Sequence, residues 1–131
     1  MRRGFTTIEI ITAIAISGIV VTIVALSFGK LNDNRALDKA ALTAISAFDE
    51  ARSLALSSSD GNQYGVNIQS MALDQRVAVR NISLTGGGSN VYFKKLTGTT
   101  DQTGTFEIYL KASTTMYRKI NIAATGLAEE I

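Results

Sequence analysis

The chain has 131 residues, enough for one small globular domain beside a membrane helix. It contains neither histidine nor cysteine, which excludes His-based acid–base catalysis, Cys nucleophiles, disulfides and zinc sites with nitrogen or sulfur ligands. The formal net charge is +2, and Arg2 and Arg3 account for it. The rest of the chain is neutral, so its charge does not indicate a nucleic-acid partner.

Residues 10–28 form an apolar run without a single charged side chain. At about 1.5 Å rise per residue, a helix of this length approaches the hydrocarbon thickness of a bilayer. Arg2 and Arg3 precede the run and favour a cytoplasmic N-terminus. A cleaved secretory signal would have a shorter apolar core with small residues after it, whereas here the small residues lie inside the run. The pattern predicts a single transmembrane helix with the following domain outside the cytoplasm.

Glu9 stands at the start of this run, where a carboxylate is costly and usually marks a functional partner. The segment Gly4-Phe5-Thr6-Thr7-Ile8-Glu9 resembles the processing site of type IV pilins and type II secretion pseudopilins. In that family a membrane aspartate peptidase, the prepilin peptidase, cuts after the glycine. The family's glutamate is fifth in the mature chain, as Glu9 is when counted from Phe5.

The resemblance implies a leader peptide of residues 1–4, cleavage between Gly4 and Phe5, and N-methylation of the new terminus at Phe5. It also implies that Glu9 sets the register of assembly, because in the filament its carboxylate pairs with the Phe5 amine of a neighbouring subunit. A plain membrane anchor, in which Glu9 only reaches toward the membrane surface, is the alternative.

We expect residues 5–29 to form the transmembrane and polymerisation helix, and residues 30–59 to form its amphipathic continuation. Residues 29–34 are poor helix formers, where we expect the helix to loosen or bend. Beyond them, apolar residues recur at spacings of three and four and predict one apolar helix face: Leu37, Ala41, Ala44, Ile45, Phe48 and Ala55. Residues 57–62 have the cap and turn chemistry that ends a helix.

Residues 60–131 are expected to form a β-rich globular head. Alternating β-branched and aromatic residues predict strands at 64–68, 76–84, 91–96, 105–110 and 117–122. Turn-rich segments at 86–90, 97–104 and 112–115 separate them and indicate antiparallel hairpins. The alternation slips near Asn81, which predicts a β-bulge. The expected fold is therefore α+β, a pilin fold whose long helix packs on a small antiparallel sheet.

Residues of the head make the resemblance more specific. Ala51-Arg52-Ser53-Leu54-Ala55 resembles the Ala-Arg-Ser-x-Ala signature of H-type pseudopilins and FimT-like minor pilins. Gly98 and Gly126 follow later strands in the same order as in those proteins. FimT-like pilins implicated in DNA uptake end in an arginine-bearing tail, whereas residues 127–131 here carry two adjacent carboxylates. These would repel a phosphate backbone, so a nucleic-acid partner is not expected.

The resemblance implies a structural subunit, a minor pilin or pseudopilin of a type IV pilus or a type II secretion pseudopilus. Its partners would be the prepilin peptidase, other pilin or pseudopilin subunits and the inner-membrane assembly platform. It would be a single-pass inner-membrane protein before assembly and part of an extracytoplasmic filament afterwards. We expect no enzymatic activity, cofactor or metal.

Other interpretations stay open at the level of sequence. The head of a minor pilin could bind DNA or a surface, or the chain could be the major pilin of the fibre. Asp60, Asn62 and Asp101 could supply oxygen ligands to calcium. The cationic residues of the head could gather on one sheet face: Lys94, Lys95, Lys111, Arg118 and Lys119.

Overall fold

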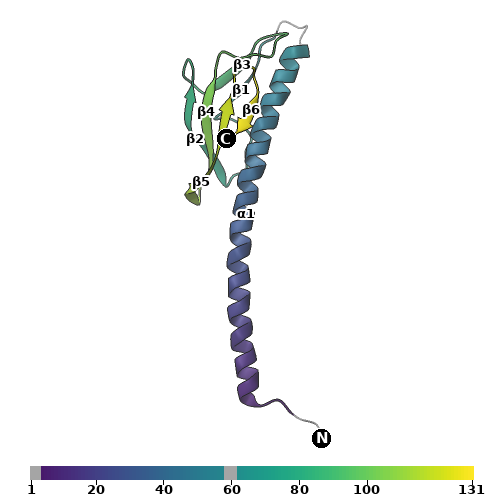
Figure 1. The fold of residues 1–131 in the computed structure, drawn as a ribbon, viewed down its shortest axis with the longest axis vertical. Helices are drawn as coiled ribbons and strands as arrows, with labels where there is room; N and C mark the ends of the chain where they lie inside the picture. The colour runs from purple at the N-terminus through teal and green to yellow at the C-terminus, as the bar shows by residue number, and fades with distance from the viewer. Residues whose placement is uncertain (1–3, 58–61) are drawn as a thin grey trace. The chain divides into compact units, whose positions relative to one another are not determined.

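A computed structural model describes residues 4–57 and 62–131 of the chain (Figure 1). The elements are the helix α1 (Thr7–Ser57) and the strands β1 (Tyr64–Asn67), β2 (Val77–Leu84), β3 (Asn90–Phe93), β4 (Gly104–Leu110), β5 (Ser113–Ile122) and β6 (Ala128–Glu130). The chain divides into two compact units, Met1–Asn34 and Arg35–Ile131. Helix α1 belongs to both units, and all the strands belong to the second.

Helix α1 is assigned without interruption through residues 29–34, so the loosening expected there is not found. A Gly, Asn or Asp inside a helix costs at most about 1 kcal/mol per residue relative to Ala. Once a helix exists on both sides, each further residue adds a backbone hydrogen bond without a new nucleation cost. The division between the units falls in this segment all the same, between Asn34 and Arg35.

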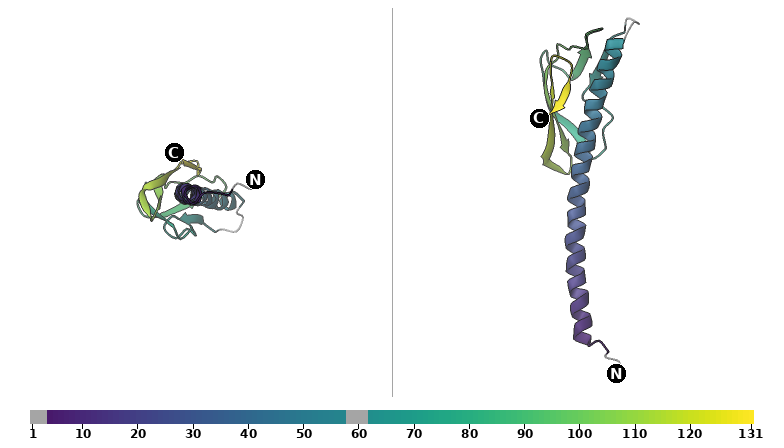
Figure 2. Two further views of the ribbon diagram at one scale, coloured as in Figure 1. Left: turned by 90° about the horizontal axis from the view of Figure 1, so that it is seen from below. Right: turned by 45° about the vertical axis from the view of Figure 1, so that its right-hand side comes forward.

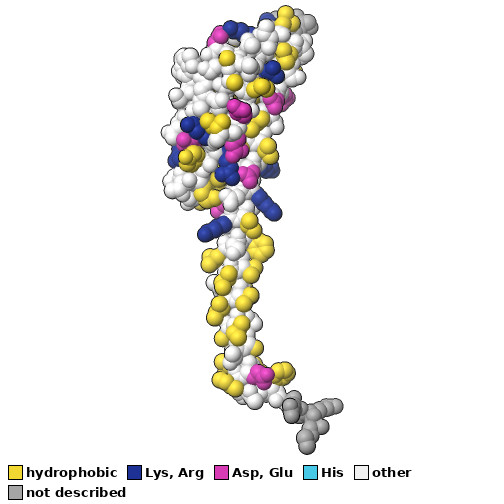
Figure 3. All heavy atoms as spheres, in the orientation of Figure 1, with side chains coloured by type: hydrophobic (Ala, Val, Ile, Leu, Met, Phe, Trp, Pro, Cys, Tyr) yellow, Lys and Arg dark blue, Asp and Glu magenta, His cyan; other side chains and the backbone are white. Residues whose placement is uncertain are grey.

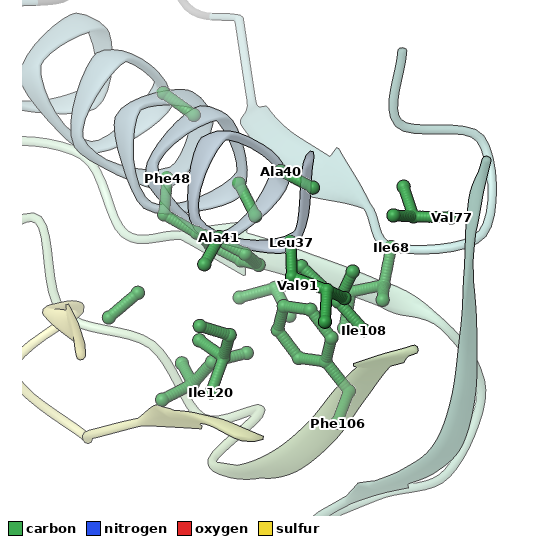
Figure 4. Close-up of a cluster of buried hydrophobic side chains, with 14 of the residues drawn as sticks. Leu37, Ala40, Ala41, Phe48, Ile68, Val77, Val91, Phe106, Ile108 and Ile120 are labelled. Atoms are coloured by element: carbon green, nitrogen blue, oxygen red, sulfur yellow. The ribbon is translucent and has the colours of Figure 1, made fainter. Parts of the chain in front are cut away.

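In the second unit, one face of α1 is buried and rich in alanine. Its buried residues are Ala36, Leu37, Ala40, Ala41, Ala44, Phe48, Ala51 and Ala55. The predicted apolar face is therefore confirmed, with Ile45 only partly buried at its border. Because alanine has a short side chain, the strands can approach the helix closely, and Phe48 and Leu37 fill the space between them (Figure 4).

The strands form two antiparallel sheets rather than the single sheet expected. One has the order β1-β3, and the other has the order β2-β4-β5-β6. Along β4 the alternate residues Phe106, Ile108 and Leu110 are buried, whereas the residues between them are partly exposed. Viewed end-on, the strands curve around one side of the part of α1 that belongs to the second unit (Figure 2). Both sheets contribute to one core with the helix face.

The predicted hairpin at 86–90 is wrong, because this segment leads from β2 in one sheet to β3 in the other. β3 pairs with β1 instead, with Tyr64 opposite Phe93. The turn expected at 112–115 is also shorter than predicted, since β5 begins at Ser113. The last strand, β6, was not predicted. It pairs with β5 and places Ala128 opposite Ile122.

The predicted bulge near Asn81 is confirmed. The pairing of β2 with β4 shifts between Arg80 and Ser83. Asn81 lies inside this shift with φ 51°, a left-handed conformation that asparagine tolerates better than most residues. The extra residue keeps Val79 and Leu84 packed against the core on either side of the shift.

Candidate functional site at the start of the helix

Gly4, Phe5 and Thr6 precede the helix and are exposed, and Thr7 is the first helical residue. The Phe5 side chain is 77% exposed. A Cβ added at Gly4 would meet no atom within 4 Å. The peptide bond between Gly4 and Phe5 therefore lies outside regular structure with open space around it, the condition in which a protease can reach a backbone.

Thr6 caps the helix. Its carbonyl oxygen accepts hydrogen bonds from the backbone N–H groups of Glu9 (3.1 Å) and Ile10 (3.2 Å). Its hydroxyl oxygen Oγ1 also accepts from the Glu9 N–H, at 3.3 Å. Thr6 and Glu9 have the Thr-x-x-Glu spacing of a capping box, and a carboxylate in the first helical turn is favoured by the helix dipole. The position of Glu9 therefore also suits the start of a helix, an effect that the Thr-x-x-Glu spacing of the sequence indicates.

The hydroxyl groups of the apolar run are satisfied within the helix. Thr12, Ser17 and Thr22 each donate a hydrogen bond of 2.8 Å to the carbonyl four residues earlier, and Ser27 does so at 3.1 Å. Residues five apart are rotated by about 140° on a helix, so these hydroxyls spread around it and do not form a polar stripe. The run can therefore lie in an apolar environment on all sides without an unpaired hydroxyl donor.

The apolar side chains of this unit are exposed all round the helix. They include Ile10, Ile11, Ile14, Ile16, Ile19, Val20, Val21, Ile23, Val24, Leu26 and Phe28. In Figure 3 this part of the chain is covered by hydrophobic side chains with very few charges. Helix α1 is long and apolar enough to cross a membrane. An apolar surface of this extent needs a membrane or other helices to cover it.

One side of this helix has a shallow depression around Ala13, Ser17 and Gly18, bordered by Ile14 and Val21. Small residues at such spacings allow a second helix to approach closely in an apolar environment. The depression is part of the exposed apolar surface of the first unit and gives that surface a place for helix–helix contact.

The predicted site residues lie as follows. Gly4 and Phe5 are together in the exposed segment before the helix, and Glu9 is exposed in its first turn. Glu9 makes no ion pair with any residue that the structure describes. Arg2 and Arg3, predicted to orient the chain in the membrane, lie outside the described residues.

The signature residues of the head, far apart in sequence, meet near the C-terminal end of α1. Arg52 Nε donates a hydrogen bond of 3.1 Å to the Thr125 carbonyl. A Cβ added at Gly98 would lie 3.0 Å from Arg52 Cγ, and Gly126 packs against the Gly98 carbonyl, the Phe93 ring and Arg52. Both glycines have positive φ, 64° and 80°. Arg52 therefore joins the helix to the loops that carry Gly98 and Gly126.

The cationic residues of the head do not gather on one sheet face. Lys94 pairs with Asp101 at 2.7 Å after β3, whereas Lys111 Nζ donates to the Gln75 carbonyl at 2.8 Å. Arg118 on β5 forms ion pairs with Asp38 Oδ1 (2.8 Å) and Glu130 Oε1 (3.1 Å). These three cations belong to different sheets and loops, and each has an oxygen partner. Lys95 and Lys119 form no ion pair in residues 4–57 and 62–131.

The described residues do not form a cluster of ligands that would support calcium binding. Asp101 lies beside the Lys94 ammonium group, which competes with a cation for the carboxylate. Asp60 lies outside the described residues. In residues 4–57 and 62–131, no three acidic side chains are grouped so that they could hold a metal ion.

No family model matches the chain, and neither does any curated protein or solved structure. The resemblance therefore rests on the motif residues of the sequence alone.

Proposed function

We propose that the chain is a structural subunit, a minor pilin or pseudopilin, of a type IV pilus or a type II secretion pseudopilus. In this proposal the prepilin peptidase cuts between Gly4 and Phe5, and the subunit assembles through its N-terminal helix. One juxtaposition carries the proposal: an exposed, non-helical Gly4–Phe5 bond lies directly before a capped helix that has Glu9 in its first turn and is apolar all round.

The apolar helix has two successive environments in this proposal. Before assembly it spans the inner membrane, where the internal hydrogen bonds of its hydroxyl groups suit it to hydrocarbon. The unit Arg35–Ile131, which has its own buried core, stays outside the cytoplasm. During assembly the apolar helices leave the bilayer and pack against each other. The assembly platform of the inner membrane and other pilin or pseudopilin subunits are the partners in this step.

Glu9 has a specific task in the bundle of helices. A carboxylate that enters an apolar core needs a cationic partner, because an unpaired buried charge is strongly destabilising. Cleavage after Gly4 creates an amine at Phe5, a few residues from Glu9 along the chain. We propose that Glu9 pairs with the Phe5 amine of a neighbouring subunit, so that the pair fixes how far one subunit is shifted along the next.

Substitution of Glu9 tests this task. Glu9→Ala should be cleaved normally, because the cleaved bond and its exposed surroundings are unchanged. It should be lost from filaments by more than ten-fold, since breaking a buried charge pair costs about 3–5 kcal/mol. The measurement is the amount of subunit recovered with sheared filaments from cells that carry the assembly machinery. Asp49→Asn, at an exposed acidic residue of the same helix, is the matched control. Normal incorporation of Glu9→Ala would contradict the register role.

Neither alternative role has a specific contact in its favour among the described residues. Lys94, Lys111 and Arg118 have oxygen partners in different parts of the head, which does not favour a basic patch for DNA. A role as the major pilin would require an abundant subunit, and the contacts within one molecule do not bear on abundance.

A further inference from the structure

The loop after β3 displays a leucine in an unusual conformation. Leu96 has φ 64°, a left-handed conformation that is rare for a bulky L-residue, and its side chain is 75% exposed. The loop is nevertheless well held: the Leu96 N–H donates to the Ala55 carbonyl at 3.0 Å, and the Gly98 N–H donates to the Lys94 carbonyl at 2.9 Å. Strain that is kept by surrounding contacts is typical of functional positions. Leu96 is thus a fixed apolar projection; we call Lys95 and Leu96 together the knob.

On the other flank of α1, a groove of about 340 Å³ lies between the helix and β1. Its apolar lining comes from Ala51 and Leu54 on the helix, Val66 on β1 and Met71 beyond it. Glu50 borders it and is exposed. β1 pairs only with β3, so its other edge is open toward this groove within the described residues.

The knob and the groove have opposite charges. Lys95 and Glu50 are both exposed, and neither takes part in an ion pair in residues 4–57 and 62–131. They cannot meet within one molecule. Leu56 of the helix lies beside Gly98 of the knob loop, whereas Leu54 lines the groove. These two residues are two positions apart, which corresponds to a rotation of about 200° around the helix axis. The two features therefore face nearly opposite directions.

We infer that the knob of one copy of this chain docks into the α1–β1 groove of a second copy, with Leu96 in the apolar part and Lys95 beside Glu50. The inference rests on the proposed role as a filament subunit. A contact between two different surfaces of one protein is heterologous, and it leaves a free knob at one end and a free groove at the other. Repetition of the contact produces an open helical array, the symmetry that a filament requires.

Cysteine cross-linking tests the contact directly, because the chain has no cysteine of its own. Thr97→Cys places a thiol beside the knob without changing it, and Ser70→Cys places one in the groove. The full-length variants are co-expressed with a prepilin peptidase, and membranes are treated with a short bismaleimide. A mixture of the two single variants should give dimers, and the double variant should give a ladder of multimers. In the control mixture, Thr114→Cys, at an exposed position near the start of β5, takes the place of Thr97→Cys and is paired with Ser70→Cys.

Two further changes separate docking from chance collision. Leu96→Asn should lower the cross-linking yield at least five-fold, while asparagine tolerates the left-handed conformation and so preserves the loop. Lys95→Glu should lower the yield, and adding Glu50→Lys should restore it. Circular dichroism of each variant checks that the head is folded.

The inference is overturned if Thr97→Cys alone cross-links as well as the mixture, or if the mixture does no better than the control pair. Intact mass of the same membranes reports separately on the leader. An uncut leader would refute the proposed function. A cut leader without the specific cross-link would refute only the contact between knob and groove.

Discussion

At the scale of single residues, the head depends on glycines that a larger side chain could not replace. Gly126 has φ 80° and packs directly on the Gly98 carbonyl, the Phe93 ring and Arg52. Gly87 has a similar φ of 73° but open space around it. The two positions therefore separate the cost of backbone conformation from the cost of crowding.

Gly126→Ala should destabilise the head by about 2–4 kcal/mol, because the left-handed conformation and the backbone contact both disfavour a Cβ. Gly87→Ala should cost only about 1–2 kcal/mol, from conformation alone. Denaturant unfolding of the full-length protein in detergent, followed by near-ultraviolet circular dichroism, measures both. Equal losses for the two variants would contradict the tight contact at Gly126.

One partly exposed carboxylate of the head, Asp74, is stabilised in its ionised form by Arg76. The Arg76 guanidinium and backbone N–H donate hydrogen bonds to Asp74 and lower its pKa from 3.8 to about 2, with smaller electrostatic contributions from Arg76 and Lys39. Because the folded-state pKa lies below the unfolded one, the stabilisation is complete above pH 3.8 and is lost as the pH falls toward 2.

Asp74→Asn should therefore melt at a lower temperature than the parent above pH 3.8, and this difference should shrink as the pH falls to about 2. Thermal unfolding of both proteins across this range is the measurement. A difference in melting temperature that stays constant with pH would show that Asp74 acts through something other than its charge.

At the scale of elements, the second half of α1 organises the head around Phe48. This ring is fully buried and lies edge-on to Phe93, with centroids 6.4 Å apart, and 6.0 Å from the Phe106 centroid. β3 and β4 belong to different sheets, so this one helix residue contacts both sheets.

Phe48→Ala should cost about 3–5 kcal/mol, the usual loss for a buried aromatic that leaves a cavity. Leu42→Ala changes a 65% exposed residue of the same helix and should change stability by less than about 0.5 kcal/mol. The free energy of unfolding in denaturant distinguishes them. A small effect of Phe48→Ala would mean that the sheets are joined elsewhere.

The sequence allowed the helix, its buried face, the bulge at Asn81 and most strands to be predicted, because these follow from local periodicity. It did not reveal that β1 pairs with β3, since turn chemistry at Gly86–Gly88 says where the chain reverses but not which strand it joins. β6 was not predicted because glutamates such as Glu129 and Glu130 are uncommon in strands. Residues 128–130 form a strand because they pair with β5. For the site, Gly4, Phe5 and Glu9 form a recognisable local motif, whereas the meeting of Arg52 with Gly98 and Gly126 depends on the fold.

At the scale of the whole molecule, one chain combines two kinds of surface. The unit Met1–Asn34 exposes apolar side chains on every side, and the unit Arg35–Ile131 buries its own in a shared core. In the proposed function, lipid covers the first surface before assembly and neighbouring helices cover it afterwards. Cleavage at Gly4–Phe5 precedes this change of environment.

Intact-mass spectrometry of the protein after co-expression with a prepilin peptidase tests this proposal most directly. We expect the loss of residues 1–4 and a methyl group on the new N-terminus at Phe5. Gly4→Leu should remain uncut, because its larger side chain would hinder entry of the bond into the cleft of the peptidase. An intact N-terminus, under conditions in which a control prepilin is cut, would contradict the proposal and would identify the chain as an ordinary membrane-anchored domain.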